Sequence, residues 1–332
     1  MTREQLLKNL QEPTKPVDVV LDTDAYNEVD DRFAIAYLLR SKEKLNTKAI
    51  YAAPYLHTKV ETPEEGMENS YREILKLLDM LGEEVPVFKG SRTYLKNDCY
   101  FPEKLYEEVN RPYSEYKGMN PPVNKDDFVE SEAARDLVAR AKNYSPENPL
   151  YVVAIGAITN IASAILMDNS ITENIVVVWL GGKSRHQNDA KEYNLVQDYN
   201  AARTVMDSGV PFVQIPCLGV TTHFKLTKLE FEHWLLGQTP IADYLARETI
   251  ESMQELVQTD LWSTTIHDVI PVAWLLNAER GFMSYRIENL RLPQDDGHYG
   301  EELPDKKMGY VFYVDRDSLL RDLFGKILGR KF

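Results

Sequence analysis

The 332-residue chain is poor in cysteine and has no long apolar run. Its two cysteines, Cys99 and Cys217, lie far apart in the sequence, so they form neither a disulfide framework nor a metal-binding motif of the usual spacing. No apolar stretch is long enough to span a bilayer, and the polar residues 1–5 lack the apolar core of a signal peptide. We therefore expect a cytoplasmic protein with no membrane partner.

Positive charge is also in short supply. The chain has 38 Lys and Arg against 52 Asp and Glu, which gives a formal net charge of −14. Binding to a nucleic-acid backbone requires clustered positive charge, so this composition argues against nucleic acid as a partner. A small neutral or cationic substrate fits the charge better. Because no linker rich in Pro, Gly or Ser divides the chain, residues 1–332 are expected to form one domain with insertions.

Carboxylates, in contrast, are concentrated near the start of the chain. Four of them fall within ten residues, between a stretch typical of a buried strand and a stretch typical of a helix. They are Asp22, Asp24, Asp30 and Asp31. Open α/β sheets place ligand sites at such strand ends, and converging carboxylates favour Ca²⁺ or Mg²⁺ between them. The alternative is that these acids only form a turn and begin the helix.

Apolar segments of strand length alternate with amphipathic helical segments along most of the chain. The expected strands are residues 17–21, 46–53, 85–88, 150–155, 175–180 and 211–215. The expected helices are residues 33–39, 66–78, 133–138, 161–166, 201–206 and 271–276. This pattern is typical of an α/β fold with an open, mostly parallel central sheet flanked by helices. Residues 94–129 interrupt it and are expected to form an irregular surface segment.

Three later segments carry polar groups near predicted strand ends or helix starts. The backbone carbonyl of Ile155 lies at a strand exit, where it could point into a crevice. Glu192 and Asn194 end a polar loop, and they could bind a polyhydroxylated ligand or simply face solvent. His267 and Asp268 precede an apolar helix, where an Asp is common for structural reasons alone.

Taken together, these blocks resemble the inosine-uridine preferring nucleoside hydrolase family. The signature of that family is an acidic loop of the form Asp-x-Asp-Pro-Gly-x-Asp-Asp, which corresponds here to residues 22–31. Further blocks follow in the family's order at residues 156–162, 180–182, 192–202 and 267–268. The resemblance implies a Rossmann-like core and an N-glycosyl hydrolase that releases free base and ribose in purine or pyrimidine nucleoside metabolism. It also implies a homodimer or homotetramer.

The resemblance implies a calcium site as well. Asp24, Asp31 and Asp268 would bind Ca²⁺ through their carboxylates. The backbone carbonyl of Ile155 would be a further ligand. Asp24 would also be the general base that takes a proton from water, whereas Asp22 would support the site from outside.

The remaining roles implied by the resemblance concern the substrate, which would be a small-molecule nucleoside. Asp30, Glu192 and Asn194 would bind hydroxyl groups of the sugar. His267 would give a proton or a hydrogen bond to the departing base, because imidazole titrates near neutrality. Carboxylates and amide oxygens around the sugar would stabilise the positive charge that develops on its ring.

The chain departs from the family pattern near the expected sugar site. Residues 25–29 stand where the family has Pro-Gly-x, so the acidic loop is two residues longer. The Asn that the family carries after the second strand is missing, and Ala53 and Pro54 occupy that stretch. Position 186, where some members have an amide, is His186. Nucleosidase chemistry is therefore better supported than any particular nucleoside.

Two other readings of the acidic loop stay open. A haloacid-dehalogenase-like Mg²⁺ phosphohydrolase also begins with a strand and Asp-x-Asp, although Tyr26 stands here where such enzymes normally have Thr. A non-catalytic, calcium-dependent nucleoside- or sugar-binding protein would keep the carboxylates but lack turnover. Free base, phosphate or ligand binding without product would distinguish the three readings.

Overall fold

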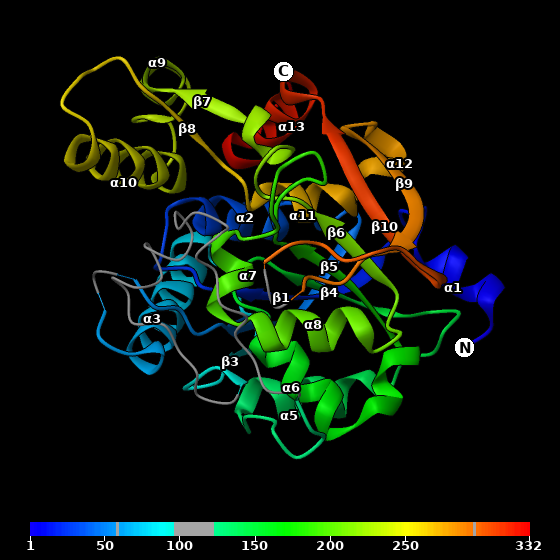
Figure 1. Cartoon of the computed structure of the whole chain (residues 1–332). Coiled ribbons are helices and arrows are strands. Elements are labelled where there is room, and N and C mark those ends of the chain that lie inside the picture. The colour runs from blue at the N-terminus through cyan, green and yellow to red at the C-terminus, as the bar shows by residue number, and fades with distance from the viewer. Residues whose placement is uncertain (58–59, 96–122, 295–296) are drawn as a thin grey trace.

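The computed structural model describes residues 1–57, 60–95, 123–294 and 297–332 (Figure 1). Most of the predicted surface segment 94–129 therefore lies outside the described residues. The centre of the described part is an eight-stranded sheet with the order β3-β2-β1-β4-β5-β6-β10-β9. Every neighbouring pair is parallel except β10 with β9. The predicted α/β class with an open, mostly parallel sheet is confirmed.

The six predicted strands are all present, with ends that differ by up to two residues from the expected ones. The strands of the sheet are β1 (Val17–Thr23), β2 (Leu45–Ala52), β3 (Val87–Lys89), β4 (Leu150–Ala154), β5 (Ile175–Leu180), β6 (Phe212–Ile215), β9 (Met283–Leu290) and β10 (Leu303–Val314). Every residue of β4 and β5 is buried, as expected for parallel strands that are covered on both faces. The buried apolar residues form two large clusters. Within β1, Val19 and Leu21 belong to the first cluster and Val20 belongs to the second.

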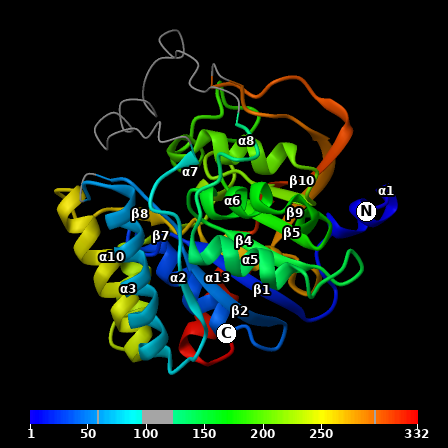
Figure 2. The same ribbon diagram turned by 90° about the horizontal axis from the view of Figure 1, so that it is seen from below.

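Helices cover both faces of the sheet (Figures 1 and 2). The first cluster is formed with α2 (Asp30–Leu39), α3 (Pro63–Leu81), α11 (Val269–Trp274) and α13 (Arg316–Leu328). The second is formed with α5 (Glu132–Ala141), α6 (Thr159–Met167) and α8 (Tyr199–Asp207). Local sequence sets the ends of α3: the Thr62 side chain accepts a hydrogen bond from the Glu65 backbone, and Gly82 ends the helix with φ 65°.

Residues between β6 and α11 form an excursion that the sequence did not predict. It contains η4 (Thr221–His223), β7 (Lys225–Thr227), α9 (Lys228–Glu230), η5 (Phe231–Leu235), α10 (Pro240–Leu256) and β8 (Ser263–Thr265). Figure 2 shows α10 beside α3. Buried Arg32 of α2 bridges the two helices, with Nε 3.0 Å from Glu73 of α3 and an Nη atom 2.7 Å from Glu248 of α10. The excursion is thereby tied to the helix that begins with Asp30.

The sequence reading also missed elements near both ends of the chain. These are α1 (Arg3–Asn9), α12 (Asn277–Arg280), β9, β10 and α13. Only the two end residues of β9 are buried, so this strand shows no continuous apolar run. β10 does carry one at residues 308–314, of which 308–311 are buried, and the sequence reading overlooked it. Among the described residues, no helix is long and apolar enough to cross a membrane.

Candidate active site

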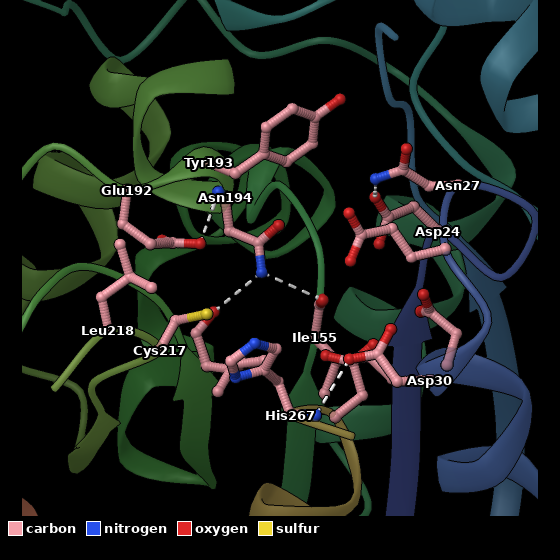
Figure 3. Close-up of a pocket in the computed structure, with 14 residues that line it drawn as sticks. Asp24, Asn27, Asp30, Ile155, Glu192, Tyr193, Asn194, Cys217, Leu218 and His267 are labelled. Atoms are coloured by element: carbon pink, nitrogen blue, oxygen red, sulfur yellow. Dashed lines mark hydrogen bonds between the residues drawn. The ribbon is translucent and has the colours of Figure 1, made fainter. Parts of the chain in front are cut away.

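The site lies where the sheet changes direction. From β1 the chain continues to β2 and β3 on one side, and later enters β4, β5 and β6 on the other. The carboxyl ends of β1 and β4 are neighbours, and ligands bind at such switch points in open α/β sheets. A cavity of about 180 Å³ opens there. It is lined by Asp24, Asn27, Glu28, Asp30, Asp31, Ile155, Leu180, Glu192, Tyr193, Asn194, Cys217, Leu218, His267 and Asp268 (Figure 3).

Three carboxylates in this cavity form a compact group. Asp30 and Asp31 are the first residues of α2, and Asp268 immediately precedes α11. One carboxylate oxygen from each lies within 4.8 Å of the others, and all three side chains are buried. Packing of α11 on α2 brings them together across most of the chain. The predicted meeting of the acidic loop with the His-Asp segment is thus present.

The environment of this group disfavours the ionised form of its carboxyl groups. Burial is the main cause that raises the pKa of Asp30 and of Asp31 to about 7; repulsion by Asp31 contributes at Asp30, and repulsion by Glu28 contributes at Asp31. Burial and repulsion by Asp30, Asp31 and Asp24 also raise the pKa of Asp268. A cation among the oxygens would offset both effects, and an all-oxygen donor set suits a hard divalent ion. The residues present therefore fit a metal site.

Asp24 follows β1 directly and lies on the same side of the cavity as Asp30 (Figure 3). Its carboxylate accepts a hydrogen bond from Asn27 Nδ2 at 2.9 Å. A Cβ atom at Gly156 would lie 2.5 Å from Asp24 Oδ1, so only glycine leaves room for this carboxylate. Burial, followed by repulsion from Asp31, raises the pKa of Asp24. The predicted ligand Asp24 is not part of the compact group, in which Asp30 is the third member.

The opposite side of the cavity is built by a helix start that the sequence reading took for a loop (Figure 3). Helix α7 (Tyr193–Gln197) is capped by Glu192, which accepts backbone hydrogen bonds from Asn194 and Leu195. A further backbone hydrogen bond comes from Gly182 at 2.7 Å. Burial nevertheless raises the pKa of Glu192 to about 7. Most of the hydrogen-bonding capacity of this carboxylate is therefore used within the protein.

Asn194 links this helix start to two strand ends. Its Nδ2 donates to the carbonyls of Ile155 and Leu180, both at 3.1 Å. Each carbonyl oxygen has a second lone pair, so Ile155 can still accept another partner. The amide oxygen of Asn194 has no hydrogen bond among the described residues and is available to a ligand that donates.

His267 forms the floor of the cavity between the two sides in Figure 3. Its backbone N–H donates to Asp30 Oδ2 at 3.0 Å. Its Nδ1 lies 2.6 Å from the hydroxyl oxygen of Thr221, which is also within hydrogen-bonding distance of the Cys217 carbonyl, at 2.5 Å. Loss of solvation is the main cause that lowers the pKa of His267 to about 4, so the ring is neutral at pH 7.

Asp22 lies outside the cavity, as the prediction of a supporting role requires. It is buried and accepts a hydrogen bond from Asn160 Nδ2 at 2.7 Å. Burial raises its pKa to about 7. His186 does not line the cavity either, and its ring lies against the Ser184 hydroxyl.

Several lining residues were not predicted. Asn27 and Glu28 belong to the lengthened loop, and that departure from the family signature was the signal that could have found them. Cys217 and Leu218 follow β6, where the rule that sites gather at carboxyl strand ends could have pointed to them. Tyr193 carries no local signal, because a tyrosine between two polar residues is ordinary in sequence.

Comparisons with known proteins agree with this geometry. A family model described as inosine-uridine preferring nucleoside hydrolase matches residues 19–311. The pyrimidine-specific ribonucleoside hydrolase RihA of Citrobacter koseri is 28% identical over 259 residues, covering 75% of this chain and 77% of that protein. RihA of Enterobacter sp. strain 638 is 27% identical over 270 residues, covering 79% of each chain.

Solved structures share the fold. A purine-preferring ribonucleoside hydrolase from Gardnerella vaginalis has a TM-score of 0.70 at 24% identity and covers 94% of this chain and 98% of its own. The plant nucleoside hydrolase PpNRh1 has a TM-score of 0.68 at 21% identity, with 94% and 99% covered. The type III effector XopQ, solved with adenosine diphosphate ribose, has a TM-score of 0.64 at 15% identity, with 99% and 97% covered.

Proposed function

The chain belongs to the inosine-uridine preferring nucleoside hydrolase family, and we propose that it hydrolyses ribonucleosides with Asp24 as general base and Ca²⁺ as cofactor. Family membership makes it an N-glycosyl hydrolase acting on nucleosides. The metal, the base and the roles of single residues go beyond the family assignment. They rest on the side chains that line the cavity.

The calcium proposal is supported by the buried carboxylates. Asp31 and Asp268 contribute oxygens to the compact group, Asp24 lines the same cavity, and Ile155 has a free carbonyl lone pair. Oxygen donors that include several carboxylates and a carbonyl match the preference of Ca²⁺. When bound, Ca²⁺ would supply charge neutralisation and make water at the site a stronger acid.

The proposed reaction uses the residues on the two sides of the cavity. Asp24 takes a proton from a water molecule, the oxygen of that water bonds to the anomeric carbon, and the electron pair of the N-glycosidic bond leaves with the base. Positive charge on the sugar ring develops beside carboxylates, which stabilise it. Asp30 and the amide oxygen of Asn194 hold sugar hydroxyls. Glu192 holds the start of α7 and offers its remaining lone pair to the sugar.

His267 is proposed to serve the departing base. A neutral imidazole carries one N–H, and the Thr221 hydroxyl can give its single hydrogen either to His267 Nδ1 or to the Cys217 carbonyl. When Thr221 donates to Nδ1, the imidazole hydrogen is on Nε2, and this N–H can donate a hydrogen bond to a nitrogen of the departing base. Thr221 therefore sets which nitrogen of His267 is the donor.

The observation that carries the proposal is the convergence of Asp24, Asp30, Asp31 and Asp268 on one cavity within the family-matched residues. The direct test is incubation with a panel of purine and pyrimidine nucleosides and Ca²⁺, followed by chromatography of the free base. We expect equal amounts of base and ribose. Binding of a nucleoside without any product would contradict the proposal.

Replacement of His267 with alanine should reveal whether the leaving group needs this donor. We expect a loss of about 10² to 10⁴ in kcat with ordinary nucleosides and less than about tenfold with p-nitrophenyl riboside, because nitrophenolate leaves without protonation. His186→Ala is the matched control, since His186 does not line the cavity. Equal losses on both kinds of substrate would contradict the donor role.

The family assignment favours hydrolysis of nucleosides over the phosphohydrolase reading, because the match covers residues 19–311 and extends far past the first acidic loop. Phosphate release from phosphomonoesters is accordingly not expected. A single domain, a homodimer or homotetramer and a cytoplasmic location, all expected from the sequence, remain proposals. Light scattering after size-exclusion chromatography tests the oligomer.

A further inference from the structure

The lengthened acidic loop places a side chain in the cavity at a position that the family signature does not have. Residues 25–29 stand where the signature has Pro-Gly-x, and Asn27 is the middle residue of this segment. The Asn27 backbone N–H donates to the Asp24 carbonyl at 2.8 Å, which closes a turn. That turn directs the Asn27 side chain back to the Asp24 carboxylate, as Figure 3 shows.

The hydrogen bond between the two side chains has one sensible polarity. Asn27 Nδ2 lies 2.9 Å from Asp24 Oδ2. Turning the amide over would place its oxygen against a carboxylate oxygen, so the donor orientation is required whenever Asp24 is ionised. The other amide atom, Oδ1, is buried and has no hydrogen bond among the described residues. No other group in the described part of the chain therefore competes with Asp24 for the Asn27 side chain.

The second departure from the family pattern lies beside the first in space. Strands β1 and β2 are parallel neighbours, and Thr23 pairs with Ala52. The residues that follow them, Asp24 and Ala53, therefore leave the sheet side by side. The family carries an Asn after its second strand, whereas the methyl side chain of Ala53 can donate no hydrogen bond. The chain lacks an amide directly after β2 and gains one on the lengthened loop.

We propose that Asn27 is the positioning residue of this active site: it holds the Asp24 carboxylate in place, so that the lengthened loop replaces the amide missing after β2. Gly156 bounds Asp24 on the other oxygen, because a Cβ there would lie 2.5 Å from Oδ1. The Asp24 carboxylate thus lies between the Asn27 amide, which donates a hydrogen bond to Oδ2, and Gly156, which has no side chain. The inference rests on the proposed function, in which Asp24 is both base and metal ligand.

Partners of metal-binding carboxylates orient them, and their loss commonly costs about 10- to 100-fold in metal affinity or activity. Asn27→Ala should therefore lower kcat by about 10- to 100-fold and raise the Kd for Ca²⁺ by about tenfold, with a smaller effect on KM. Asn27→Asp should lose more than Asn27→Ala, because a second carboxylate would then face Asp24. Isothermal titration calorimetry with Ca²⁺ alone provides the readout that does not depend on activity.

Asn46, near the start of β2, offers a matched control. Asn46 donates to Asp18 Oδ1 at 2.6 Å, an exposed contact of the same chemistry outside the site. Asn46→Ala should leave kcat and Ca²⁺ affinity within about twofold of the wild type. Thermal melts of all variants check folding, and two different substitutions at position 27 guard against a defect specific to one of them.

The outcomes separate this inference from the proposed function. If the wild type binds no Ca²⁺ and cleaves no nucleoside, the proposed function fails. If the wild type does both and the Asn27 variants match Asn46→Ala in kcat and in Ca²⁺ affinity, the positioning role of Asn27 is wrong while the proposed function stands. A loss of kcat and Ca²⁺ affinity at position 27, with the melting temperature preserved, supports the inference.

Discussion

Replacement of Asp24 with asparagine is expected to lower kcat by at least about 10³-fold, because the variant loses its general base together with one charged metal ligand. The substitution keeps the size of the side chain, so the space beside Gly156 stays filled. An amide cannot take a proton from water at neutral pH. Stopped assays of free base, with enzyme concentrations high enough to detect slow turnover, would measure the loss.

Asp18→Asn is the control for this substitution. Asp18 lies near the start of β1, at the opposite end of the strand from Asp24, and binds Asn46 and Tyr144. It does not line the cavity. Its variant should retain activity within a few fold, whereas an Asp24→Asn enzyme within about tenfold of the wild type would contradict the role of Asp24.

Removal of calcium should abolish turnover and change how stability depends on pH. Asp30 and Asp31 have a pKa of about 7 in the metal-free fold against an ordinary value of 3.8. Between about pH 4 and pH 7 the folded state therefore binds more protons than the unfolded state, so the free energy of unfolding falls as pH rises through this window. Ca²⁺ should cancel much of that fall, since it binds the ionised carboxylates.

Thermal melts in excess chelator and in excess Ca²⁺, at about pH 5 and about pH 7.5, test this expectation. In chelator the melting temperature should be lower at the higher pH, and Ca²⁺ should raise it mainly there. Asp268→Asn should melt above the wild type in chelator at the higher pH, because one repelling charge is gone, and should respond less to Ca²⁺. A calcium response that is absent, or equal at both pH values, would argue against this metal site.

The core of the fold was predictable because its signals are local. Val19, Val20 and Leu21 form a short run, rich in β-branched residues, that is typical of a buried strand, and the alternation of such runs with helices indicates a parallel sheet. β9 escaped prediction because most of its positions are half-buried or exposed, whereas the apolar run of β10 at residues 308–314 was a strand signal that the sequence reading overlooked. Glu192 was taken for a loop residue because its role as the cap of α7 depends on hydrogen bonds from backbone N–H groups. Every loop and every helix start has such groups, so the residue types do not distinguish the two.

The order of acidic, amide and His-Asp blocks along the chain determined the family and the list of candidate site residues, because each block is a short pattern of residue types. The alternation of apolar runs with helical segments determined the sheet. Their distances from one another were decided only by tertiary structure. Asp30 receives a hydrogen bond from His267 across 237 positions, and no local pattern encodes a separation of that length. The position of Asp24 beside Ala53 likewise follows from the pairing of β1 with β2. The contact of Asn27 with Asp24 follows from the path of the loop. Packing decides which polar groups meet, since sequence periodicity specifies the face of an element but not its neighbour.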